Sequence, residues 1–397
     1  MFYWFFRSSK RKSILQEYNE FCDEEYVNIV QHISTRWLCL KSCVSRELDK
    51  FEGIKSYFLS ERSPDKRFKR LRPQFEDPMT TAYLRFYQST LPVFDNMNKL
   101  LQAEDPLIHR QYETQQHFMK KLASKFIEPE VIQRHVASGG SLGCLDLSTS
   151  NQKSDADLSV GLLTGSIVEH LFTEGDVSQQ QVDRFYDGVR AFFTKAYSYC
   201  ASWLRLDDDL LRYCVFVDFT KRAATPFSYV EKILPFFKNI YDTTLKDPAV
   251  LEGVHDEYIE YQAISDTDII SDEVWERAQV GISDNENDNK RKCDYRMDVI
   301  WGHLQDRFPD LAAIALTVLT VPHSNAAEER AFSIIRRNRT DFRPTLQLGV
   351  SLNSIMRIKM AMPESLCKCC DWEPAEELLR KCKSATREYN KQHGCKK

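Results

Sequence analysis

Residues 321–344 of the chain have the sequence VPHSNAAEERAFSIIRRNRTDFRP. Asn325, followed three residues later by Glu328, forms a capping-box-like start, which predicts a helix that begins here and runs to about Arg337. With 3.6 residues per turn, one face of this helix is apolar, and its small alanines allow a close approach. Pro344 closes the segment. The apolar face consists of Ala327, Ala331, Ile334 and Ile335.

The apolar face of this helix needs a surface to cover it. A second amphipathic helix is expected over 352–360, where Leu352, Ile355, Met356 and Met360 recur at helical spacing. Phe332, with Ile335, is expected to anchor the packing. The surface that Phe332 meets is either the preceding helix, at Leu316 and Leu319, or a second subunit, and the sequence leaves both alternatives open.

The charged residues of the same segment predict contacts of two kinds. Glu329 lies opposite the apolar face, beside Arg336, and is expected to have a structural role, as a helix-surface acid that pairs with a nearby arginine or faces the remnant of the core. Arg330 is expected to form a buried or interface hydrogen bond, because its planar guanidinium suits such pairing.

The bulk composition predicts a folded protein with uneven charge. The chain has 397 residues, with 42% hydrophobic and 12% aromatic content, enough for two or three structural units. Its net charge is only -4, but residues 241–300 hold 16 acidic and 6 basic residues, whereas residues 62–72 hold six basic residues and one acid. A protein specialised for coating DNA would be more basic, so any phosphate contact must use local patches.

The cysteines and the first residues indicate a reducing compartment and no membrane span. Twelve cysteines follow no regular framework, and the apolar opening MFYWFF is six residues long, too short for a span or a secretory signal. The tail cysteines have no complete set of zinc-ligand spacings, and no metal or other cofactor is expected.

Most of the chain shows helical periodicity, which predicts a mainly α fold. The long apolar stripes at 83–101 and 182–204 are examples, although Pro92 should kink the first. Asp207 is expected to cap the helix that follows the second, and 137–154 is expected to be a flexible loop. Only Tyr26–Ser34 shows the partial alternation of a strand.

The segment around Glu329 resembles the C-terminal signature of the hAT superfamily of DNA transposases. That signature has a serine, a few small residues, Glu-Arg, any residue, and Phe-Ser. The matching residues here are Ser324, Asn325, Ala326, Ala327, Glu329, Arg330, Ala331, Phe332 and Ser333, with Glu328 as an extra residue. The resemblance implies that the segment belongs to a dimerisation region and that Glu329 corresponds to one of three catalytic carboxylates.

A second stretch also resembles this family. Thr35-Arg36-Trp37, followed by a helix over 38–51, is similar to the element after the last strand of the RNase H-like catalytic core. The resemblance implies that Trp37 could stack on a DNA base, although a packed aromatic is the simpler interpretation.

These resemblances imply a mainly α chain with the remnant of an RNase H-like core, a large all-helical insertion and a C-terminal helical dimerisation region. The chain is similar to domesticated transposases of the zinc-finger BED and zinc-finger MYM type, with an N-terminal truncation. The expected domains are 1–60, a core remnant with the Arg-Trp motif; 61–298, the helical insertion; 299–362, the dimerisation region; and 363–397, a tail helix.

The expected function is dimerisation without catalysis. In active relatives two aspartates precede the Arg-Trp motif, whereas Asp23 is the only aspartate before Thr35 here, and one glutamate cannot hold two metal ions. Glu329 is therefore expected to be vestigial. The expected partner is a second copy or a related hAT-derived protein, in the nucleus or otherwise in the cytoplasm.

Two alternatives remain open. The first is a sequence-nonspecific DNA- or chromatin-binding module, whose candidate contacts are Trp37, Arg67, Arg70, Arg336 and Arg337. The basic run at 62–72 could also be a nuclear-import address, although charge runs of this kind are usually solvated helix faces. The second alternative is an active hAT DNA transposase, if a missing front part is supplied.

Overall fold

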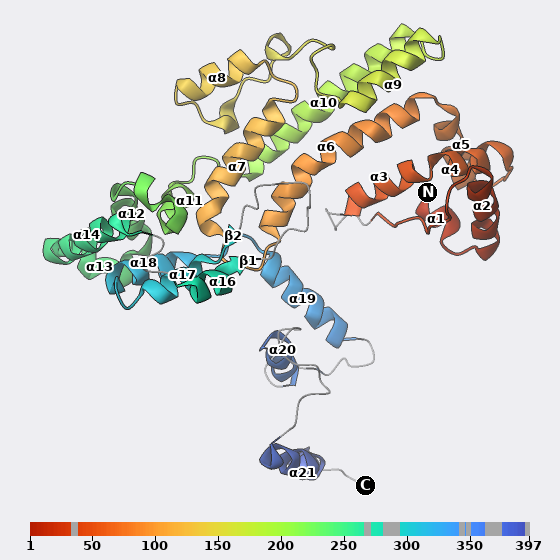
Figure 1. Cartoon of the computed structure of the whole chain (residues 1–397). Coiled ribbons are helices and arrows are strands. Elements are labelled where there is room, and N and C mark those ends of the chain that lie inside the picture. The colour runs from red at the N-terminus through yellow and green to blue at the C-terminus, as the bar shows by residue number, and fades with distance from the viewer. Residues whose placement is uncertain are drawn as a thin grey trace. The chain divides into compact units, whose positions relative to one another are not determined.

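The computed structural model describes residues 1–32, 39–265, 271–280, 294–340, 346, 351–361 and 375–393. The contacts divide the chain into two units, Met1–Ser324 and Asn325–Lys397. Helices make up nearly all the regular structure of the described residues, which confirms the mainly α fold class (Figure 1). The strands described are β1 (Gln279–Val280) and β2 (Asp294–Tyr295), which pair antiparallel.

The first unit begins with a small aromatic core. Phe58 is fully buried and stacks on Phe75, with ring centroids 4.8 Å apart. The indole of Trp4 donates a hydrogen bond to the hydroxyl of Tyr57 over 3.1 Å. The helices around this core are α1 (Phe2–Phe5), α2 (Ser9–Phe21), α3 (Cys39–Asp49), α4 (Phe51–Ser60) and α5 (Lys66–Glu76).

The strand expected at Tyr26–Ser34 does not form over its described part, Tyr26–His32. The side chains of Tyr26 and Ile29 pack against the helices of the aromatic core instead. Alternation alone does not make a strand, because the backbone also needs a neighbouring strand as its hydrogen-bond partner. The RNase H-like remnant proposed for residues 1–60 therefore stays a prediction.

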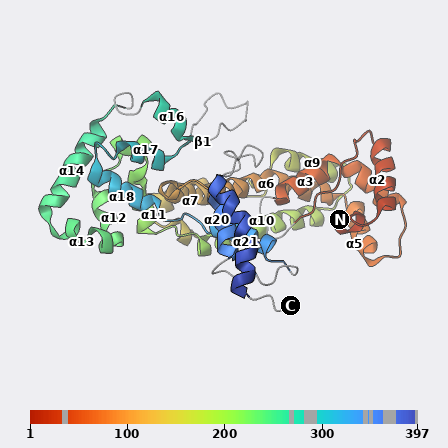
Figure 2. The same cartoon turned by 90° about the horizontal axis from the view of Figure 1, so that it is seen from below.

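The middle of the first unit is a second core, in which two long helices lie side by side in both views (Figures 1 and 2). Phe86 of α6 meets Phe185 and Phe193 of α10 edge to face, and Phe126 stacks on Phe193. Pro92 lies inside α6, which continues past it. The helices are α6 (Met79–Leu101), α7 (Ile108–Ala123), α8 (Pro129–Ala137), α9 (Leu162–Thr173) and α10 (Gln179–Trp203).

The loop expected at 137–154 is fastened to this core. The hydroxyl of Tyr197 donates a hydrogen bond of 2.6 Å to the carbonyl of Leu142, and Ser141 donates one of 2.6 Å to Asp207. Because the carboxylate of Asp207 already accepts the hydrogen bond from Ser141, the next residue, Asp208, caps the following helix. Asp208 accepts the backbone N–H of Leu211 over 3.2 Å. The expected cap at Asp207 was therefore wrong by one residue.

The third core of the first unit is built on Trp301. This indole is fully buried, donates a 2.8 Å hydrogen bond to the carbonyl of Val217, and lies 4.9 Å from the ring of Tyr261. Glu257 accepts the backbone N–H of Leu311 over 2.8 Å, so a carboxylate caps the start of α18. The helices are α11 (Asp209–Tyr213), α12 (Ser228–Ile233), α13 (Lys238–Lys246), α14 (Pro248–Ala263), α16 (Asp272–Ala278), α17 (Met297–Leu304) and α18 (Pro309–Leu319).

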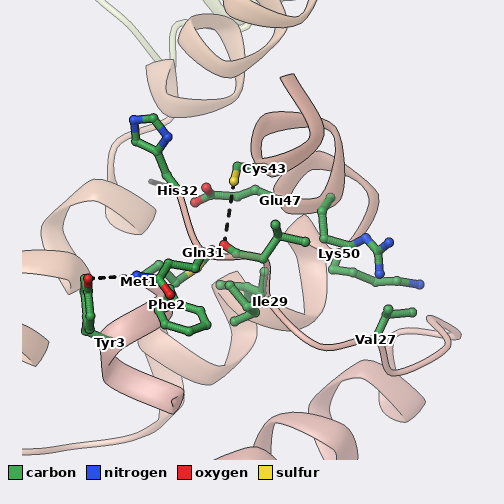
Figure 3. Close-up of a pocket in the computed structure, with 13 residues that line it drawn as sticks. Met1, Phe2, Tyr3, Val27, Ile29, Gln31, His32, Cys43, Glu47 and Lys50 are labelled. Atoms are coloured by element: carbon green, nitrogen blue, oxygen red, sulfur yellow. Dashed lines mark hydrogen bonds between the residues drawn. The ribbon is translucent and has the colours of Figure 1, made fainter. Parts of the chain in front are cut away.

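A cavity of about 300 Å³ lies between the N-terminal segment and α3 (Figure 3). Its walls are mainly apolar and include Phe2, Val27 and Ile29, whereas His32, Cys43 and Glu47 add polar groups. Burial raises the pKa of the Glu47 carboxyl above its ordinary 4.5, and the nearby terminal ammonium opposes this shift. Such surroundings destabilise the charged carboxylate relative to the same group in water.

We predict that Phe193→Ala lowers the free energy of unfolding of the first unit by about 3–5 kcal/mol. The ring is fully buried between two aromatic neighbours, so its loss leaves a cavity. Urea unfolding followed by circular dichroism measures the change. Phe172→Ala is the matched control, because that ring is 47% exposed and its removal should change stability by much less.

A second prediction concerns the pH dependence of stability. Because the folded-state pKa of Glu47 is raised, the native protein binds this proton more tightly than the unfolded chain. The contribution of Glu47 to stability is therefore present below pH 4.5 and is lost as pH rises through the raised pKa. Glu47→Gln should be more stable than wild type at pH 7, with the difference shrinking towards pH 4 in thermal unfolding. Equal pH profiles would contradict this, and exposed Glu52→Gln is the control.

Candidate functional site

The second unit contains the helix expected from the sequence around Glu329. This helix is α19 (Ala326–Asn338), and it contacts α20 (Ser351–Ala361). In α20 the side chain of Leu352 is fully buried, Met356 is 9% exposed and Ile355 is half-buried. The expected pair of amphipathic helices is therefore present. A further helix, α21 (Glu376–His393), belongs to the same unit.

The apolar face of α19 is only partly covered. Ala331, Ile334 and Ile335 are half-buried, Ala327 is exposed, and no residue of α19 is fully buried. Phe332 follows Ala331 and so projects about 100° round the helix from it. Its ring is 61% exposed. Both alternatives for Phe332, the preceding helix at Leu316 and Leu319 or a second subunit, therefore stay predictions.

The start of α19 differs in one detail from the expected capping box. Asn325 is the N-cap residue, but its side chain makes no capping hydrogen bond. An N-cap side chain reaches the first turn from an extended backbone, whereas Asn325 has φ -90° and ψ 14°. The carbonyl of Asn325 still accepts the N–H of Glu329 over 3.0 Å.

The charges of α19 are arranged along its axis. Glu328 and Glu329 lie in the first turn, and Arg336 and Arg337 lie in the last. This order opposes the helix dipole and stabilises the helix. All four residues are exposed, whereas Arg330 is half-buried. The structural role expected for Glu329 stays a prediction.

The candidate phosphate contacts on the first unit lie on α5. Phe68 and Phe75 are buried in the aromatic core, and Asp65 accepts the N–H of Arg67 over 2.7 Å to cap the helix. This anchoring leaves the cations Lys66, Arg67, Lys69 and Arg70 exposed. Arg67 also donates a 3.3 Å hydrogen bond to the carbonyl of Tyr3.

The Arg-Trp motif lies outside the described residues, so the base-stacking role of Trp37 stays a prediction. Within the described ranges, no group of three or more His, Cys, Asp or Glu side chains is placed to hold a metal ion. None of the described helices is long and apolar enough to cross a membrane.

One side-chain cluster was missed by the sequence reasoning. The Nδ1 atom of His32 lies 3.3 Å from the Sγ atom of Cys39, and Cys39 hydrogen-bonds Cys43. The spacing of the two cysteines, one helical turn apart, was a visible signal. The contact with His32 was not, because it depends on how Tyr26–His32 crosses the helices.

Comparison with known families gives one match. Residues 286–360 match the model described as the hAT family C-terminal dimerisation region. The chain matches no curated protein and no solved structure.

The matched residues include α17, α18, α19 and α20, so the family region crosses the boundary at Ser324. Its first two helices complete the core around Trp301, and its last two form the partly covered pair of the second unit. Residues 286–360 are therefore similar to the hAT family C-terminal dimerisation region, and this match supports membership of the hAT family.

Proposed function

We propose that this chain is a catalytically silent, transposase-derived protein that forms a homodimer through α19 and α20. The observation that supports this most directly is the 61% exposed ring of Phe332, which lies inside the residues that match a dimerisation region. A large aromatic side chain in water is a strong anchor for an interface, because burying it stabilises the complex by about 1.5–3 kcal/mol.

The two ends of α19 carry opposite charges, which suits a symmetric contact. In a two-fold dimer the same patch meets itself, so two α19 helices can cross antiparallel. Glu328 and Glu329 of one chain then lie near Arg336 and Arg337 of the other. The exposed Ala327 allows the backbones to approach closely. Opposite charges at the edge of such a contact select the antiparallel register more than they add affinity.

One aromatic ring does not make a stable interface alone. A specific interface buries about 800 Å² on each partner. α19 has 13 residues and a length of about 20 Å, and α20 adds 11 residues. The proposed interface therefore uses both helices, with Leu352 and Met356 of α20 holding α19 in place from behind.

The proposal gives Glu329 no catalytic role. Phosphoryl transfer by two metal ions needs several carboxylates that converge, whereas Glu329 is exposed on a helix whose neighbouring acid is Glu328.

Incubation of the chain with hAT-type transposon-end DNA and Mg²⁺ should yield no cleaved strand. Cleavage that disappears in Glu329→Gln would establish the alternative, an active transposase.

We predict that the wild-type chain has twice the monomer mass of 46.4 kDa in light scattering at micromolar concentration. Phe332→Asp should raise the dimer dissociation constant at least about 30-fold, because it places a charge where the ring is buried, a loss of 2 kcal/mol or more. Phe236→Asp is the matched control, since that ring is 51% exposed on the first unit. A monomeric wild type, or an unchanged mass in Phe332→Asp, would contradict the proposal.

A second function, binding of nucleic-acid phosphates without sequence preference, is favoured by α5. Four exposed cations on one anchored helix form a local basic surface on a chain of net charge -4. Because Phe68 and Phe75 are buried, this surface is presented as a folded helix, which suits a duplex backbone better than a receptor that needs an extended chain.

We predict that duplex DNA binds weakly, with log K falling linearly with log salt concentration. Arg67→Gln with Arg70→Gln should reduce the slope by about 2, because each phosphate contact contributes about 0.9. The double variant Arg336→Gln with Arg337→Gln is the comparison. If that variant reduces the slope and the α5 variant does not, the phosphate-binding surface lies on α19. Fluorescence anisotropy from 50 to 200 mM salt measures both, and no binding at 50 mM would remove this function.

A further inference from the structure

The missed cluster lies on α3 beside the cavity of the first unit. Cys39, Cys43 and Glu47 are spaced four residues apart, so they share one face of this helix. Figure 3 shows Cys43, Glu47 and His32 at the same end of the cavity, all three among its lining residues. Cys39 is half-buried and hydrogen-bonds Cys43. The two thiols are therefore hydrogen-bonded neighbours, and the cavity of about 300 Å³ lies next to Cys43.

The surroundings give the two thiols different chemistry. Burial raises the pKa of Cys43, and the neighbouring Cys39 and Glu47 raise it further, so Cys43 keeps its proton. Its S–H group lies 3.7 Å from the carbonyl of Val30. The imidazole of His32 lies 3.3 Å from the sulfur of Cys39. An imidazole at this distance can take up the thiol proton as the sulfur attacks, so we assign Cys39 as the attacking thiol of the pair.

We propose that Cys39 and Cys43 form a redox-active thiol pair that a peroxide oxidises to an intrachain disulfide. The Cys39 thiolate attacks one oxygen of hydrogen peroxide; the S–O bond forms, the O–O bond breaks, and hydroxide leaves. The sulfur of Cys43 then attacks the resulting sulfenic acid. The S–S bond forms, the S–O bond breaks, and the hydroxyl leaves as water with the proton of Cys43. Two thiols are oxidised by two electrons and one peroxide is reduced to two waters.

Formation of the disulfide requires a local change in the backbone of α3. Residues four apart in a helix have Cα atoms about 6 Å apart, within the range that disulfides span. The Cβ atoms must come closer than a regular helix allows. The helical turn between Cys39 and Cys43 therefore has to open. The cavity beside Cys43 and His32 gives a small oxidant access.

The other described cysteines provide internal controls. Cys144 and Cys382 are exposed, and among the described residues neither hydrogen-bonds a second thiol or an imidazole. Burial raises the pKa of Cys200 to about 11 and that of Cys214 to about 12, so both are poor nucleophiles at neutral pH. If exposure alone decided which thiol is oxidised first, Cys144 and Cys382 would react first. The proposed chemistry instead predicts that Cys39 reacts first.

The test is mild oxidation of the full chain with hydrogen peroxide at neutral pH. N-Ethylmaleimide then blocks the remaining thiols before a non-reducing tryptic digest. Trypsin cuts after Arg36, Lys41 and Arg46, so the disulfide would join peptides 37–41 and 42–46. We expect this linked pair to form before Cys144 or Cys382 is modified, and to disappear with dithiothreitol. If Cys144 and Cys382 are oxidised while both peptides carry maleimide, the proposal is wrong.

Variants separate the two steps. In Cys43→Ser the sulfenic acid on Cys39 has no resolving thiol, so dimedone should trap it at that position. His32→Gln should slow disulfide formation severalfold and leave the linked product unchanged, whereas Cys144→Ser should change neither. Linkage of Cys39 to a cysteine other than Cys43, or equal rates in His32→Gln and wild type, would overturn the proposed roles.

Discussion

Burial of Trp301 is the constraint on which the proposed function depends. Its indole is enclosed in the third core and its N–H is paired with the carbonyl of Val217, so α17 and α18 are held in the first unit. The matched dimerisation region is thereby divided at Ser324. Its first half contributes buried side chains to the third core, and its second half, α19 and α20, forms the interface that we propose. A substitution at the proposed interface can therefore prevent dimerisation while the third core stays folded.

The second unit follows a different physical logic. An isolated helix of 13 residues is marginally stable in water, and α19 has no fully buried residue of its own. Contact with α20 covers part of its apolar face, and Phe332 remains exposed. Self-association would complete this packing, which makes the stability of α19 and the formation of the dimer two aspects of one equilibrium.

The cavity in the first unit shows how burial changes the acid–base properties of polar side chains. Glu47 and Cys43 line the same cavity, and the low polarity there favours the protonated form of both. Cys39, on the same helix, does not line this cavity and has the imidazole of His32 3.3 Å from its sulfur. The difference between two like thiols arises from position alone.

The sequence by itself determined the helical class, the amphipathic pair α19 and α20, and the family signature around Glu329, because these depend on local periodicity and residue identity. It misplaced the cap at Asp207, because Ser141, far along the chain, hydrogen-bonds this carboxylate. It also misplaced the strand at Tyr26–Ser34, because a strand needs a neighbouring strand as its partner. Only the tertiary structure decided that Phe332 is exposed and that His32 touches Cys39. Burial and long-range contacts are properties of packed helices, and no local pattern encodes which surfaces the packing leaves uncovered.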